Sequence, residues 1–168
     1  MADIVPATLK KEEDKRDEIW TNKIKPAKNN RVVLLELEKW LKTLILKNFQ
    51  ESRLQIKGAY TFVKTQISQR GALGIDYIER NELRSFLVAL KIRFEILDAF
   101  KKISGQKQNE PVDVNDFIAN KKVIEKWSKP IPIPVKVFDP LKKNGVVNFN
   151  EMCDWACKLN YDKEGDKL

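Results

Sequence analysis

Oxygen-bearing side chains near the C-terminus have the types and spacing of a loop that could hold a calcium ion. In the segment KKNGVVNFNEMCDWACKLN, residues 142–160, the side chains of Asn144, Asn148 and Glu151 carry oxygens, and Gly145 suits a sharp turn. Calcium takes about six to eight oxygen ligands, and a common calcium loop of about 12 residues ends on an acid that supplies two of them. These three residues are therefore the candidate metal ligands.

The same loop lacks most of the oxygens that calcium needs. With Glu151 as the last of 12 residues, the first, third and fifth ligand positions fall on Pro140, Lys142 and Asn144. Only Asn144 of these can ligate, and Lys142 brings a positive charge toward the ion. We therefore expect no cofactor and no metal, or at most a weak site formed by Asn144, Asn148 and Glu151.

Other reactive side chains do not suggest catalysis. The chain has no His, the commonest general base, and its two cysteines, Cys153 and Cys157, are not spaced as a CxxC motif. We expect both thiols to be reduced and half-buried on one face of a helix. The sequence predicts a protein that is not an enzyme, and an unexpected carboxylate or thiol site would be the exception.

A repeated pattern indicates the elements that would carry such loops. An apolar residue is followed four positions later by an acid and then by another apolar residue, starting at Val32, Ile78, Val112 and Val147. The intervals are 46, 34 and 35 residues, and the nearly constant period of the last three units indicates one supersecondary unit per repeat. In an EF-hand, a helix–loop–helix unit, the apolar residue pairs with the partner loop and the acid opens the second helix. The alternative is a plain helical bundle with solvated acids.

Apolar residues recur with helical spacing on both sides of these loops. The segments 31–49 and 81–103 each carry one broad apolar stripe. We therefore expect a mainly α, two-lobed EF-hand fold with degenerate loops. Its parts would be a charged N-terminal arm and helix (1–30), an N-terminal lobe (31–90) and a C-terminal lobe (91–168). In the last helix, the side chains predicted to be buried are Phe149, Met152 and Trp155.

The order and spacing of residues from Ile78 to about Asp162 resemble the flagellar calcium-binding proteins called calflagins, and more widely the calmodulin-like EF-hand proteins of cilia. The resemblance is carried by IERNELRSFLVALKIRFEILDAF, VDVNDF, Trp127 and FNEMCDWACKLNYDKEGD. It implies a ciliary or flagellar protein. The chain departs from the family at Lys142, where the family has its first Asp, and at Ala2, where lipid-anchored members have Gly. Calcium binding and a membrane anchor are therefore not expected.

Positive charge is concentrated in one part of the chain. The net charge is +8, and between residues 39 and 70 one acid, Glu51, stands among seven basic residues: Lys39, Lys42, Lys47, Arg53, Lys57, Lys64 and Arg70. A one-signed patch of this kind favours an acidic partner, although a solvated helix face is the alternative. No nucleic-acid-binding signature is present, so we do not expect nucleic acid as the partner. No apolar run approaches the roughly 18 residues of a membrane span, and no secretory signal is recognisable at Met1.

Together these observations predict a structural, non-catalytic protein of the ciliary or flagellar axoneme. As part of the cytoskeleton, it would bind tubulin on the microtubule wall or neighbouring axonemal proteins through the seven basic residues. The alternative is a weak calcium sensor.

Overall fold

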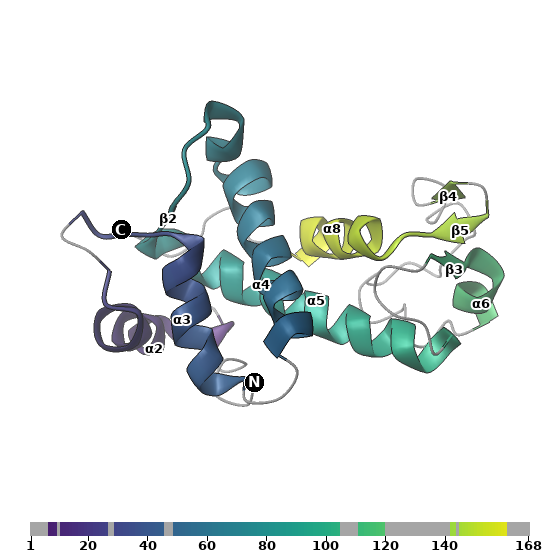
Figure 1. Ribbon diagram of the computed structural model, residues 1–168, viewed down its shortest axis with the longest axis horizontal. Coiled ribbons are helices and arrows are strands. Elements are labelled where there is room, and N and C mark those ends of the chain that lie inside the picture. The colour runs from purple at the N-terminus through teal and green to yellow at the C-terminus, as the bar shows by residue number, and fades with distance from the viewer. Residues whose placement is uncertain are drawn as a thin grey trace. The chain divides into compact units, whose positions relative to one another are not determined.

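The computed structural model describes residues 7–9, 11–26, 29–45, 49–104, 111–119, 142–143 and 145–160, and these are mainly helical (Figure 1). They divide into two compact units, the first ending at Lys91 and the second running from Ile92 to Asn160. Within these ranges, no helix has the length and apolarity needed to cross a membrane.

The first half of the first unit is a helix, a loop, a short strand and a second helix. Helix α2 (Glu13–Glu18) runs directly into the π-helical segment η1 (Ile19–Ile24), which ends where Lys25 adopts a left-handed conformation with φ of 56°. Strand β1 (Arg31–Val32) and helix α3 (Leu34–Leu44) follow. The apolar stripe predicted over 31–49 places Leu37, Trp40 and Leu41 among the buried residues of α3.

The second half repeats this order. Helix α4 (Phe49–Phe62) continues as the π-helical segment η2 (Val63–Ile67), followed by the 3-10 turn η3 (Arg70–Leu73). Strand β2 (Ile78–Glu79) and the 3-10 turn η4 (Arg80–Glu82) then lead into the long helix α5 (Leu83–Ser104).

Strands β1 and β2 pair in antiparallel fashion and join the two halves of the first unit. Val32 lies opposite Ile78, and Arg31 lies opposite Glu79. Both apolar side chains are fully buried. These are two of the four apolar positions that the repeat predicts to pair with one another.

The second unit contains the remaining pair. Strand β3 (Val112–Asp113) precedes the short helix α6 (Val114–Ala119), and strands β4 (Lys142–Lys143) and β5 (Val146–Val147) precede helix α8 (Phe149–Asn160). Strand β5 lies between β3 and β4 in a small antiparallel sheet (Figure 1), with Val112 opposite Val147. The predicted pairing of the apolar positions is thus confirmed in both units, whereas a plain helical bundle does not require it.

Helix α8 buries one face, which includes two of the three residues expected there. Its buried residues follow helical spacing: Phe149, Met152, Cys153, Ala156 and Cys157. The prediction is confirmed for Phe149 and Met152, but Trp155 is only half-buried because it lies beside this stripe. The ring of Phe149 packs edge-on against Phe100, with the ring centroids 5.3 Å apart.

The charged N-terminal segment is packed into the first unit over its described residues. Arg16 is fully buried, and its Nη1 donates hydrogen bonds to the carbonyl oxygens of Ala7 and Leu9, at 2.9 and 2.6 Å. The Arg80 side chain binds Asp17, with Nε 2.6 Å from Oδ1. Residues 11–26 are therefore tied to other parts of the first unit by hydrogen bonds and ion pairs.

Candidate functional site

The motif acids of the first unit cap helices. The Oε2 atom of Glu36 accepts a hydrogen bond from the backbone N–H of Val33 at 3.0 Å, and Oε2 of Glu82 accepts one from Glu79 at 2.8 Å. The first N–H groups of a helix lack partners within the helix, and an acid at its third position satisfies one of them. These two acids therefore have a structural role that needs no metal.

The other carboxylate oxygen of Glu82 faces a cation that belongs to the chain. The side chain of Arg70 is 13% exposed, and its Nη2 forms an ion pair with Oε1 of Glu82. The same nitrogen lies 3.9 Å from Oε2 of Glu79, and Nη1 donates to the carbonyl oxygen of Tyr77 at 3.5 Å. The guanidinium also lies 4.6 Å from the centroid of the Tyr77 ring, within the range of a cation–π contact.

Burial and charge act on Glu82 in opposite directions. Burial raises the pKa of this carboxyl, while the N–H of Glu79 and the charge of Arg70 lower it. The overall pKa shift is upward, so Arg70 offsets the cost of burying the carboxylate only in part.

The candidate metal ligands of the last loop are placed differently. Asn148 is exposed, and its Oδ1 accepts the N–H of Asn150 at 3.0 Å, which caps helix α8. Glu151 is half-buried in the first turn of that helix, and Asn144 lies outside the described residues. Lys142, the cation expected to oppose a metal, pairs with Val147 across β4 and β5. The described residues contain no group of three or more His, Cys, Asp or Glu side chains that could hold a metal ion.

The basic residues predicted to bind a partner have unequal surroundings. Lys47 lies outside the described residues, and the exposed members are Lys39, Lys42, Arg53 and Lys57. Arg53 already forms a salt bridge with Glu38, with Nε 3.0 Å from Oε1. Lys64 and Arg70 are half-buried, and both form ion pairs within the unit: Nζ of Lys64 lies 2.8 Å from Oδ1 of Asp76, and Arg70 pairs with Glu82. Of the six described residues of this group, four are therefore exposed and two are half-buried.

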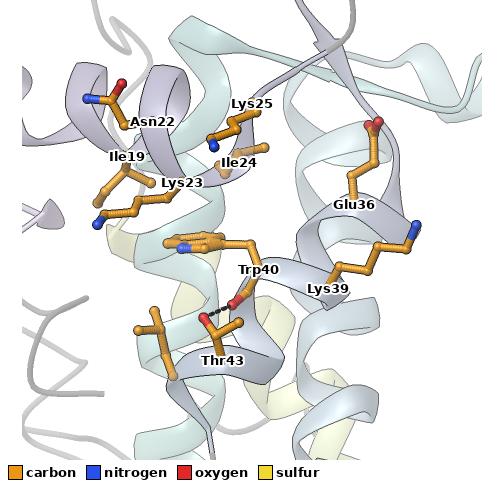
Figure 2. A pocket seen from close by; sticks show the side chains of 10 residues that line it. Ile19, Asn22, Lys23, Ile24, Lys25, Glu36, Lys39, Trp40 and Thr43 are labelled. Atoms are coloured by element: carbon orange, nitrogen blue, oxygen red, sulfur yellow. Dashed lines mark hydrogen bonds between the residues drawn. The ribbon is translucent and has the colours of Figure 1, made fainter.

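A basic groove is present between η1 and α3. It has a volume of about 770 Å³ and an apolar floor, which includes Ile19, Ile24, Trp40 and Leu44. Lysines 23, 25 and 39 and one acid, Glu36, line its polar part, and all three lysines are exposed. Figure 2 shows Lys23 and Lys39 extending on opposite sides of Trp40, a residue that is only 6% exposed. We call these residues the lysine groove.

A second hollow, of about 580 Å³, lies between α3 and α4. Its charged residues are Arg53, Lys57, Glu38 and Glu51, so positive and negative charges balance. The lysine groove, with three cations and one anion, is therefore the better site for an acidic ligand.

Of the three lysines that line the groove, the sequence predicts Lys39 as a partner-binding residue but does not indicate Lys23 or Lys25. Lys23 and Lys25 belong to the segment predicted to be a charged N-terminal arm and helix (1–30). The signal that could have found them is the run IWTNKI, residues 19–24, because Ile19, Trp20 and Ile24 share one face of a helix.

The two cysteines are unsuited to thiol chemistry. Both are free thiols and, contrary to the half-buried placement predicted for them, fully buried. Burial raises the pKa of Cys153 to about 12, and it raises the pKa of Cys157 still further. A thiol that stays protonated is a poor nucleophile.

Comparison with known proteins gives a weak similarity. No family model matches the chain. Over 93 residues, the chain is 30% identical to a flagellar calcium-binding protein of Trypanosoma cruzi; the match covers 54% of this chain and 44% of that protein. The chain thus spans less than half the length of the curated relative it matches. The predicted resemblance to flagellar calcium-binding proteins is confirmed to this extent.

Proposed function

We propose that this protein is a non-catalytic, EF-hand-like interaction protein of the cilium or flagellum that binds an acidic surface without needing calcium. Two features support the EF-hand-like interpretation. The helix–loop–strand–helix order occurs twice in the first unit, and the strands pair at the apolar positions of the repeat. The flagellar location is suggested by the name of the T. cruzi relative.

The observation that carries the interaction role is the lysine groove. Its apolar floor can accept an apolar side chain, and its three lysines can attract carboxylates around that side chain. Charge complementarity of this kind steers association and favours a partner of opposite charge. We propose the acidic surface of tubulin in the microtubule wall as the partner, and an acidic neighbouring axonemal protein is the alternative outcome of the test.

Charge reversal in the full chain tests this role. Lys23→Glu/Lys39→Glu reverses the groove, and Lys102→Glu/Lys158→Glu applies the same charge change to exposed lysines of the second unit. We expect the first variant to lose at least tenfold in affinity for microtubules, while the second retains most of the affinity. A third variant, Arg53→Glu/Lys57→Glu, tests the second hollow. Equal affinity of the first two variants would contradict docking in the groove.

The competing role, a weak calcium sensor, has one supporting observation, the name of the matched relative. In that case the sensing site would have to lie in the second unit, near Asn148 and Glu151. Calcium titration of an Asn148→Ala/Glu151→Gln variant beside the unmodified chain would reveal it.

A further inference from the structure

The loop that ends at Glu82 keeps the oxygen atoms of a calcium loop's second half. With Glu82 as its twelfth residue, the seventh is Tyr77 and the ninth is Glu79. Calcium loops bind the ion through the backbone carbonyl of the seventh residue, often through water at the ninth, and through the acid at the twelfth. The guanidinium of Arg70 contacts the carbonyl of Tyr77 and the carboxylate of Glu82, and it lies 3.9 Å from that of Glu79.

We infer that the guanidinium of Arg70 takes the place of a bound cation in this loop. Three observations agree with this assignment. The group is positively charged, it is held by oxygens from all three ligand positions, and its side chain is largely withdrawn from solvent. An Arg side chain stays protonated at any physiological pH and cannot dissociate from the loop as an ion can.

The first half of the loop explains why a metal ion does not fit beside Arg70. The first, third and fifth positions are Gly71, Leu73 and Ile75, none of which has a side-chain oxygen. A divalent ion would thus gain few ligands while being repelled by the guanidinium. The tethered cation keeps the carboxylate of Glu82 paired at any calcium concentration. This inference does not depend on whether the lysine groove binds a partner.

The role of the charge is tested by two substitutions of similar length in the full chain. Arg70→Lys retains a positive charge and Arg70→Met removes it, and Arg53→Met controls for loss of an exposed ion pair. We expect Arg70→Met to lower the Tm by about 5 °C or more, with Arg70→Lys and Arg53→Met losing clearly less. Failure of Arg70→Met to fold, with Arg70→Lys folded, supports the same conclusion. Equal melting of the Lys and Met variants would overturn it.

A second test asks whether Arg70 stands in place of a bound metal ion, and it adds the carboxylate ligands that the loop lacks. Leu73→Asp/Ile75→Asp adds carboxylates at the third and fifth positions, where both side chains are exposed. Gly71 is left unchanged because a Cβ there would lie 2.5 Å from Cγ2 of Thr65. We expect 5 mM calcium to raise the Tm of Leu73→Asp/Ile75→Asp/Arg70→Met by several degrees, and to leave the Tm of the variant that retains Arg70 nearly unchanged. An equal shift in both variants, or a shift in neither, would show that Arg70 does not occupy a cation position.

Discussion

Positively charged side chains of the first unit have two kinds of surroundings: some are exposed to solvent, and others are held in ion pairs. Lys39 points to solvent at the edge of a groove, whereas Arg70, of the same sign and in the same predicted basic group, is bound by three oxygen-bearing residues. The difference matters for function because Lys39 is available to a partner and Arg70 is not. Counting charges along the sequence could not separate the two, since a long cationic side chain can reach a carboxylate 12 residues away.

The ion pair of Arg70 and Glu82 should make the effect of Arg70 on the Tm depend on pH. Arg70 lowers the pKa of Glu82 because its positive charge favours the ionised carboxylate. The stability that Arg70 contributes through this pair therefore requires ionised Glu82, and it is lost as the pH falls through the pKa of Glu82. The difference in Tm between the unmodified chain and Arg70→Met should therefore be largest near pH 7 and should shrink in acid. Thermal melts of both chains between pH 7 and pH 3.5 check this, and a constant difference would contradict an electrostatic role.

The cysteines provide a second test. Because burial raises both thiol pKa values, neither Cys153 nor Cys157 should be appreciably ionised at pH 8. We expect a disulfide reagent such as Ellman's reagent to leave both thiols unmodified in the native protein and to modify both after unfolding in urea. Rapid reaction of the native protein would mean that this face of α8 is open to solvent.

In helix α8, two aromatic residues differ in burial, so their substitution by Ala should lower the stability of the protein by different amounts. Phe149 is 3% exposed and contacts Phe100, whereas Trp155 is half-buried beside the apolar stripe. Phe149→Ala should therefore destabilise the protein by about 3–5 kcal/mol, and Trp155→Ala by about 1–2 kcal/mol. Urea unfolding followed by circular dichroism measures both, and a larger loss for Trp155→Ala would reverse the assignment of the buried face.

Much of the arrangement of the elements could be predicted from the sequence, because the repeat combines two independent constraints. Val32, Ile78, Val112 and Val147 had to be apolar to pair across short strands, and acids four residues later had to open helices, two of which cap them directly. What the sequence could not show was tertiary packing of the charged N-terminal segment. The burial of Arg16 and the contact of η1 with α3 depend on backbone carbonyls and on neighbours distant in the chain.

The calcium response expected of the whole chain follows from the residues that occupy its loops. The loop ending at Glu82 is held by Arg70, and Lys142 of the last loop is part of a strand. We expect no calcium affinity tighter than roughly millimolar, the range of the weakest natural calcium loops. Isothermal titration calorimetry checks this directly. A micromolar affinity would support the calcium-sensor alternative instead.

Binding to an acidic filament should be electrostatic and independent of calcium. The lysine groove is exposed, and interactions between exposed charges are screened beyond about 8 Å at physiological ionic strength. Co-sedimentation of the full chain with stabilised microtubules, with EGTA and with 1 mM calcium at low and physiological salt, tests the proposed function most directly. We predict that the bound fraction is the same with EGTA and with calcium and falls as salt rises. Absence of binding at low salt, or binding only when calcium is present, would contradict the proposal.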